Sequence, residues 1–600
     1  MTTIPERLSA LRSAMQQHQI AAYLVPSSDP HQSEYVAPRW ETRAWLSGFT
    51  GSAGTLIVTD TAAGVWTDSR YFIQAEAQLE GTGVVLQKQQ IPHAPEHVDW
   101  LANNLQTGDK LGFDGRVVSL SSARLLRRKL QTKGIQLEAR YDLPGKVWAD
   151  RPAMPQSEIF DFAVEYAGVS REEKLGQIRN WLEQQQADAI LLTALDDIAW
   201  SLNIRASDVD YNPVCISYLI VDREGARWFV GEERIDETLR RSMAAAGVHI
   251  LEYGAIDGAL ENYPVSKTLA IDPAGTSFYH FELLSGKDVK EIGSPVTALK
   301  TIKNETEIKH YRQVMRKDGV ALLKLFRWLE AELEQRGVTE VEVSKRLAAF
   351  RAEQEAYHGE SFGAIVGYQG NGAIVHYRAE PESCATLQRE GILLLDSGGQ
   401  YLDGTTDITR TVALGEPTAE QKRHFTLVLK GMIALSRAKF PKGTGGAQLD
   451  TLARQYLWQD GLNYGHGTGH GVGFFLNVHE GPQGFATSAV TSRGRTAFEA
   501  GMVTSNEPGF YRTDHYGIRI ENLILCIPQE KTEYGQFYGF EELTLFPIDQ
   551  TLMDTDLLTA QEIDWLNGYH QKVEEELSPL LTSNEERNWL QDRCKAIANS

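Results

Sequence analysis

Two aspartates eleven residues apart are the side chains of this sequence whose positions most demand a chemical explanation. Asp396 directly follows the apolar run 392–395, where an ionised carboxylate is costly to bury unless a cation or dense hydrogen bonding compensates it. Residues 391–411 have the pattern of a buried strand, a turn and a second strand that contains Asp407. A hairpin would bring Asp407 back beside Asp396, and two carboxylates that close cannot both stay ionised without positive charge between them. The pair therefore predicts a cation and further ligands elsewhere in the chain.

Later segments carry residue types that could complete such a site. His466 and His470 lie on a glycine-rich loop, whose backbone can come close to a ligand, and His479 follows shortly after. Glu507 stands just before a Pro-Gly turn, and Glu521 lies inside a predicted strand of alternating apolar residues. Each of these residues alone is more often an ordinary loop or surface group. Their combination with the two aspartates points to metal binding.

Several carboxylates with one imidazole suit a pair of hard to borderline divalent cations. Oxygen ligands favour Mn²⁺, and one nitrogen is also accepted by Co²⁺, Fe²⁺ or Zn²⁺. The ligand types therefore do not determine which metal binds. A set without thiolates disfavours a structural zinc site.

The bulk composition is that of a soluble globular protein. The 600 residues are 42% hydrophobic and carry a net charge of −21, which disfavours a nucleic-acid or anionic-membrane partner. No apolar run approaches the roughly 18 residues of a membrane span, and the amino terminus is amphipathic rather than a signal peptide. We expect a cytoplasmic protein with four reduced, buried thiols: Cys215, Cys384, Cys526 and Cys594.

The first half of the chain has the pattern of a duplication. A helix followed by strands at 21–25, 55–58 and 65–68 is matched about 160 residues later by a similar order of elements. Two related α/β domains are the simplest account, and we place them at residues 1–155 and 156–302.

A third domain of α+β type is predicted at residues 303–547. It begins with a long helix capped by Asn304 and Glu307 and ended by Gly337, and a second helix starts at Thr339. Residues 548–600 form a helical extension that we expect to pack on this domain.

Around the predicted ligands the sequence resembles a known family. The strings DSGGQYLDGTTDITRT, HGTGHGVG, NEPGFY and RIENL are similar to those of the methionine aminopeptidase, prolidase and aminopeptidase P group. The strings WLSGFTGSAG, TDSRY and LDDIAWSLNIR resemble the long three-domain cytosolic aminopeptidase P, although Ala206 stands where that form favours glycine. The resemblance implies two creatinase-like α/β domains followed by a catalytic domain of the pita-bread fold.

The resemblance also implies a role for each ligand. Asp407 would chelate one metal, Asp396 and Glu521 would bridge both metals, and His470 with Glu507 would complete the other shell. A hydroxide held between the metals would be the nucleophile, and Glu507 would also accept the proton that water loses when this hydroxide forms.

Further site residues follow from the same resemblance. His376 and His479 would bind the substrate carbonyl and stabilise the oxyanion, and His466 would line a proline pocket. Arg519 would pair with a ligand carboxylate such as Asp396, and Tyr511 would reach the site.

The implied function is a metal-dependent aminopeptidase that removes the residue before a proline in second position. A homodimer with two divalent ions, Mn²⁺ foremost, is expected from the family. The alternatives are a prolidase restricted to Xaa-Pro dipeptides, which would need a cation for the substrate carboxylate, and a non-catalytic peptide-binding protein. A methionine aminopeptidase would leave the first two domains unexplained.

Overall fold

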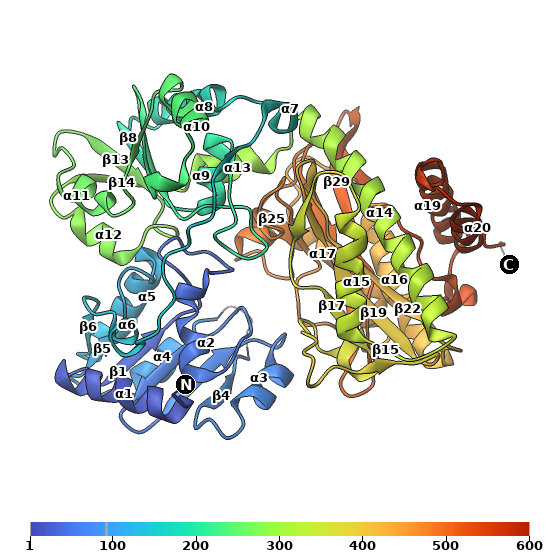
Figure 1. The fold of residues 1–600 in the computed structure, drawn as a ribbon, viewed down its shortest axis with the longest axis horizontal. Helices are drawn as coiled ribbons and strands as arrows, with labels where there is room; N and C mark the ends of the chain where they lie inside the picture. The colour runs from blue at the N-terminus through green and yellow to red at the C-terminus, as the bar shows by residue number, and fades with distance from the viewer. Residues whose placement is uncertain (1, 91–93, 599–600) are drawn as a thin grey trace. The chain divides into compact units, whose positions relative to one another are not determined.

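The structure is a computed structural model that describes residues 2–90 and 94–598. It divides into two compact units, drawn in Figure 1. The first runs to Val164 and from Val169 to Val296, and the second takes Glu165–Gly168 and the chain from Thr297 onward. Among the described residues, each helix is too short or too polar to cross a lipid bilayer. The predicted domain limits near residues 155, 302 and 547 stay predictions.

Two six-stranded sheets with the same topology form the first unit. In each sheet the central strand, β1 (Ala22–Val25) or β8 (Ala189–Leu192), pairs antiparallel with one neighbour, and that neighbour pairs antiparallel with the next strand. The other three pairings in each sheet are parallel. The first sheet has the order β4 (Val85–Lys88), β3 (Ala63–Thr67), β2 (Thr55–Thr59), β1 (Ala22–Val25), β5 (Lys110–Gly112), β6 (Gln136–Glu138). The second has the order β12 (Val248–Leu251), β11 (Ala226–Phe229), β10 (Tyr218–Asp222), β8 (Ala189–Leu192), β13 (Thr268–Ile271), β14 (Asp288–Glu291).

The sequences AYLV of β1 and AILL of β8 are buried at every position, as expected for central strands covered on both faces. One hydrophobic cluster includes Leu24 and Leu111 of the first sheet together with Leu191 and Ile271 of the second. The matching topology confirms that the two halves are related α/β domains. Their main helices are α1 (Ile4–Gln17), α3 (Phe72–Leu79), α4 (Glu96–Asn104), α5 (Leu120–Gln131), α8 (Arg171–Gln184), α9 (Leu195–Leu202), α10 (Glu237–Ala245), α11 (Ala255–Glu261) and α12 (Phe278–Leu283).

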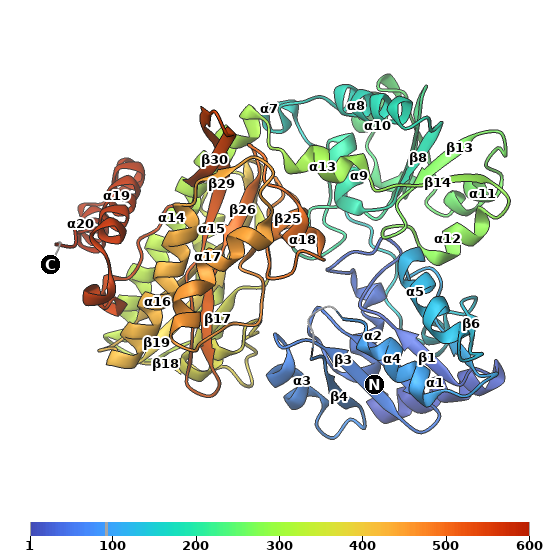
Figure 2. The same ribbon diagram turned by 180° about the vertical axis from the view of Figure 1, so that it is seen from behind.

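The second unit places strands between two pairs of helices, as Figures 1 and 2 show from opposite sides. The helices are α14 (Glu305–Leu333) with α15 (Glu340–Ala352), and α16 (Ala419–Ser436) with α17 (Gly446–Gln459). The largest sheet has the order β23 (Phe440–Pro441), β30 (Gly535–Glu542), β29 (Asn522–Thr532), β26 (Val503–Asn506), β24 (Gly469–Gly471), β25 (Glu480–Phe485). Two three-stranded sheets have the orders β17 (Ile365–Tyr368), β19 (Ile392–Ser397), β22 (Ile408–Ala413) and β16 (Tyr357–Glu360), β20 (Gly399–Tyr401), β21 (Gly404–Thr405).

The two predicted helix starts of this unit are confirmed. Asn304 caps α14 and forms a reciprocal capping box with Glu307, and Thr339 caps α15 by accepting from the N–H of Glu342. The carboxy-terminal extension contains α19 (Ala560–Leu577) and α20 (Asn584–Arg593). Ion pairs attach it to α14 and α16, among them Arg316–Glu576 and Lys430–Glu562.

Three local predictions are wrong. Asp407 lies between β21 and β22 rather than inside a strand, because a short β20–β21 hairpin is inserted where a single turn was expected. Glu521 lies in the break between β28 (Tyr516–Arg519) and β29 rather than in a continuous strand. Cys384 is partly exposed, whereas Cys215, Cys526 and Cys594 are buried as predicted.

Candidate metal centre

Antiparallel pairing brings the two aspartates and Glu521 together. In the β19–β22 ladder Asp396 faces Thr409, so that Asp407, two residues before Thr409, lies at the same end of the ladder. The N–H of Glu521 donates to the carbonyl oxygen of Thr409 over 3.1 Å. Thr409 therefore joins the three segments that carry these carboxylates.

The neighbouring large sheet supplies the other two predicted ligands. His470 lies in β24, which pairs with β26, and Glu507 follows the end of β26. The N–H of Glu507 donates to the carbonyl oxygen of Thr468 over 2.8 Å. His470 Nε2 lies 3.4 Å from Glu507 Oε1 and 3.5 Å from Asp407 Oδ2. One ligand atom each from Asp407, His470 and Glu521 lies within 4.8 Å of the other two.

The donor atoms that remain open at this centre fit divalent cations. Asp396 accepts from Arg519 through Oδ2, and Glu521 accepts from Thr409 through Oε2. Their second oxygens, Asp396 Oδ1 and Glu521 Oε1, are buried without a hydrogen-bond donor. His470 Nδ1 lies 2.9 Å from the Gly471 carbonyl oxygen; Nδ1 is then the donor, and the lone pair of Nε2 faces the carboxylates. Buried acceptors of this kind are costly unless a cation or a proton compensates them.

The electrostatics of the carboxylates agree with this reading. Burial, together with the nearby carboxylates, raises the pKa of Asp407 and of Glu521 well above the usual range. Burial raises the pKa of Glu507 to about 7, with Arg519 opposing this rise and Asp396 adding to it. Acids with raised pKa values hold protons near neutral pH unless positive charge replaces those protons. These side chains are therefore suited to bind cations.

A chain of hydrogen bonds leads away from Asp396. Arg519, which is 2% exposed, places Nη2 2.6 Å from Asp396 Oδ2 and donates from Nη1 to the Tyr511 hydroxyl over 2.7 Å. The Tyr511 hydroxyl lies 2.8 Å from His466 Nε2. Because His466 Nδ1 lies 2.7 Å from the Gly467 carbonyl oxygen, Nδ1 carries the proton and Nε2 accepts from Tyr511. Three of the predicted site residues thus form one connected network behind a predicted metal ligand.

The remaining two predicted histidines lie at the edge of this cluster. The rings of His479 and His470 meet edge to face with their centroids 4.3 Å apart. His376 directly follows Val375, whose carbonyl oxygen lies 3.5 Å from Arg519 Nη2. Both histidines are only partly buried.

Sequence reasoning missed two residues that fix the ligands. Thr409 Oγ1 donates to Glu521 over 2.7 Å, and Ser505 Oγ donates to Glu507 over 3.2 Å. Thr409 lies two positions after Asp407, and Ser505 two positions before Glu507, so each falls on the same face of an extended chain as its neighbouring ligand. That spacing of two is the signal that could have found them.

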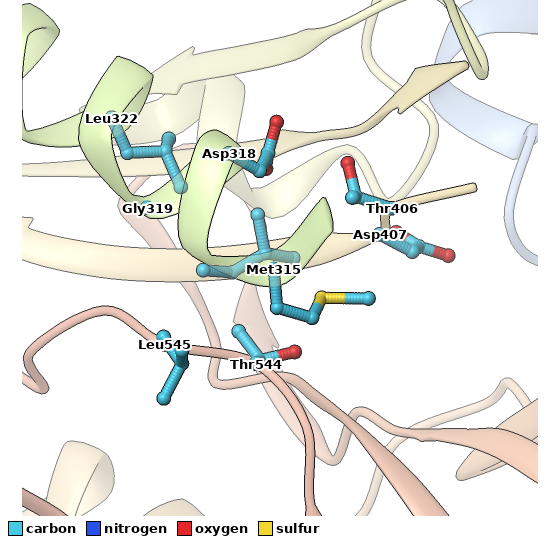
Figure 3. A pocket seen from close by; sticks show the side chains of 9 residues that line it. Met315, Asp318, Gly319, Leu322, Thr406, Asp407, Thr544 and Leu545 are labelled. Carbon is cyan, nitrogen blue, oxygen red and sulfur yellow. The ribbon is translucent and has the colours of Figure 1, made fainter. Parts of the chain in front are cut away.

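A small cavity is lined by Asp407. Its volume is about 10 Å³, and Met315, Asp318 and Thr544 are among the residues that line it. In Figure 3 the carboxylate of Asp407 points away from Leu322 and Leu545. A space of this size admits about one water molecule and no peptide.

Comparison with known protein families covers nearly the whole chain. Residues 309–528 match the metallopeptidase family M24, and residues 536–597 match the C-terminal region of peptidase M24. Residues 7–140 and 150–307 each match the creatinase/prolidase N-terminal domain. These matches confirm the predicted fold class, two creatinase-like domains followed by a pita-bread domain.

Individual relatives match the chain from end to end. A probable Xaa-Pro aminopeptidase P of Laccaria bicolor is 41% identical over 607 residues, which cover 99% of this chain and 93% of that protein. Aminopeptidase P2 of Arabidopsis thaliana is 38% identical over 634 residues, with 99% and 89% covered. The crystal structure of X-prolyl aminopeptidase from Caenorhabditis elegans, described as a cytosolic enzyme with a di-nuclear active site, has a TM-score of 0.95 at 36% identity and covers 100% of both chains. The resemblance predicted from the motifs is confirmed: this chain belongs to the Xaa-Pro aminopeptidase P group of the M24 metallopeptidases.

Proposed function

We propose that this chain is a dinuclear metallo-exopeptidase that hydrolyses the bond between an amino-terminal residue and a proline in second position. The observation that carries the proposal is the buried donor set, in which Asp396 and Glu521 each keep an oxygen without a donor. Full-length similarity to Xaa-Pro aminopeptidases supports the choice of substrate. An X-Pro amide has no N–H and a fixed ring, so a dedicated site has to receive it.

The five predicted ligands would hold two divalent ions. Asp396 and Glu521 would bridge the ions, Asp407 would bind one, and His470 with Glu507 would complete the other shell. Bound divalent ions act as Lewis acids and lower the pKa of bound water, which makes hydrolysis possible at neutral pH. Mn²⁺ is our choice among the ions that these ligands accept.

Glu507 is the proton acceptor in this proposal. Before cations bind, burial raises the pKa of Glu507 to about 7, so this carboxylate has a higher proton affinity than an ordinary glutamate. Ser505, which donates to Glu507 Oε1 over 3.2 Å, orients the carboxylate. Glu507 can therefore take a proton from water at Oε2 and return it to the departing proline nitrogen.

Histidines on either side of the centre would bind the peptide. His376 and His479 would donate to the scissile carbonyl oxygen, where negative charge develops in the transition state. His466, held by Tyr511 over 2.8 Å, would line the pocket for the proline ring. Arg519 would keep Asp396 in place and is therefore unable to serve a substrate carboxylate at the same time. These contacts argue against a prolidase that uses Arg519 to bind the carboxylate of its substrate.

The cellular setting is part of the same proposal. We infer a cytoplasmic enzyme that acts as a homodimer, in line with the description of the Caenorhabditis elegans relative as cytosolic. Its substrates are peptides, because both relatives quoted above are named as aminopeptidases.

A comparison of three short peptides tests the proposed specificity. The Mn²⁺-loaded protein is expected to cleave Arg-Pro-Pro at least about 100-fold faster, in kcat/KM, than Arg-Ala-Ala, since a site shaped for one group discriminates by several kcal/mol. It should prefer Arg-Pro-Pro to Arg-Pro as well, because a dipeptide puts an uncompensated carboxylate beside the centre. Release of arginine followed by chromatography measures all three. Equal rates on Arg-Pro-Pro and Arg-Ala-Ala would overturn the proline specificity, and a preference for Arg-Pro would favour the prolidase.

A further inference from the structure

We propose that Glu340, which has no part in the chemistry described above, is a positioning residue for His376. Its carboxylate gathers donors from both sides of His376 in the chain, within the segment 368–385. The proposal rests on the function proposed above, because it assumes that His376 binds the substrate carbonyl.

Glu340 is the first residue of α15 and is 0% exposed. Four groups donate to its two carboxylate oxygens. The N–H of Tyr368 lies 2.8 Å from Oε1, and the N–H of Ala385 lies 2.7 Å from Oε2. The Tyr377 hydroxyl lies 2.7 Å from Oε2, and Asn371 Nδ2 lies 3.0 and 3.1 Å from the two oxygens. One buried carboxylate thus closes the segment at its two ends and holds it in the middle.

The negative charge of Glu340 is favourable at this place. The first turn of a helix presents unpaired N–H groups and the positive end of the helix dipole. Hydrogen bonds to a charged acceptor are roughly twice as strong as those between neutral groups. These donors compensate the buried carboxylate, which orders a segment that is irregular apart from the short 3-10 helix Gln369–Ala373.

The opposite side of the same segment lies directly on β28. A Cβ built on Gly517 would lie 1.7 Å from the carbonyl oxygen of Gly372, so only glycine permits this approach. The carbonyl oxygen of Val375 then lies 3.5 Å from Arg519 Nη2. His376 stands between these contacts and Tyr377, the residue that donates to Glu340. Its position is set from one side by β28 and from the other by Glu340.

The expected consequence is a loss of turnover without a loss of metal. In Glu340→Gln the amide nitrogen cannot accept, so at least one of the donors on that side loses its partner. We expect kcat for Arg-Pro-Pro to fall about 10- to 100-fold, the size found for residues that orient a functional group from behind. KM should change less than kcat, and the protein should keep two bound ions.

A double-mutant cycle in the metal-loaded enzyme distinguishes positioning from general destabilisation. If Glu340 acts through His376, Glu340→Gln should change kcat by less than about twofold in the His376→Ala background. The same cycle with Tyr377→Phe, which removes one donor only, serves if Glu340→Gln does not fold. Full additivity in the cycle would overturn the proposal.

Glu586→Gln is the matched control, since Glu586 is a buried carboxylate that accepts from the N–H groups of Thr582 and Ser583 at the start of α20. Its kcat should stay within about twofold of wild type.

Amide hydrogen exchange separates this inference from the proposed function. Glu340→Gln should speed exchange in segment 368–385 at least about tenfold, whether or not the protein cleaves peptides. Unchanged exchange there would contradict the claim that Glu340 orders this segment. If the wild-type protein is inactive on Arg-Pro-Pro but exchange is faster in the variant, Glu340 orders the segment and only the proposed function is overturned.

Discussion

Replacing Asp407 with asparagine is expected to lower kcat/KM for Arg-Pro-Pro by at least about 1000-fold. The substitution keeps the shape of the side chain but removes one negative charge from a ligand whose Oδ2 lies 3.5 Å from His470 Nε2. Metal ions stabilise hydrolytic transition states by several kcal/mol, and each 1.4 kcal/mol is a tenfold change in rate. Steady-state kinetics with metal analysis by mass spectrometry should show at most one tightly bound ion per chain.

The same substitution should stabilise the protein once metals are removed by chelation. Burial beside other carboxylates raises the pKa of Asp407, so its ionised form is unfavourable without cations. The chelated variant should therefore melt at a higher temperature than the chelated wild type. Asp403→Asn is the matched control, because Asp403 lies four residues earlier and its carboxylate pairs with Lys317. An Asp407→Asn protein with full activity would show that Asp407 is not a ligand.

Replacing Arg410 with methionine is expected to destabilise the second unit by about 3–5 kcal/mol, because several buried acceptors would each lose a donor at a cost of about 1–3 kcal/mol. Arg410 is 2% exposed, and its guanidinium donates to the carbonyl oxygens of Glu521 over 2.6 Å, Phe546 over 2.7 Å and Pro547 over 3.0 Å. It also donates to the Tyr569 hydroxyl over 2.9 Å. Methionine fills much of the volume but leaves several buried acceptors without donors.

Loss of Arg410 should also weaken metal binding, because the guanidinium joins α19 of the carboxy-terminal extension to the backbone of Glu521. Calorimetry should show a lower melting temperature for the second unit, and competition with a chelator should show faster metal release. Arg316→Met is the control: Arg316 pairs with Glu576 of the same helix α19, but 41% of its side chain is exposed, so about 1 kcal/mol or less should be lost. A variant at Arg410 as stable as wild type would show that the extension does not support the metal-binding strands.

The sequence predicted those features that local pattern determines. Asp396 stood out because an apolar run precedes it, and the start of α14 followed from the spacing of Asn304 and Glu307. The duplicated α/β domains were predicted from the order of elements alone, since burial fixes that order even where few residues are identical.

Positions that depend on partners distant in the chain could not be predicted in this way. Alternation suggested that Asp407 and Glu521 lie inside strands, yet both lie where a ladder stops. Apolar alternation reports which face is buried and does not report where backbone pairing ends. Glu340 gave no signal, because its donors lie 28 to 45 residues later in the chain. Cys384 belongs to the same segment and is partly exposed.

The most direct test of the central claim is anomalous X-ray scattering from crystals of the protein grown with Mn²⁺. Two peaks about 3.5–4 Å apart are expected, the separation usual for two-metal hydrolases. Asp396 and Glu521 should contact both peaks, Asp407 one of them, and His470 with Glu507 the other. A single peak, or two peaks that these five side chains do not contact, would contradict the account.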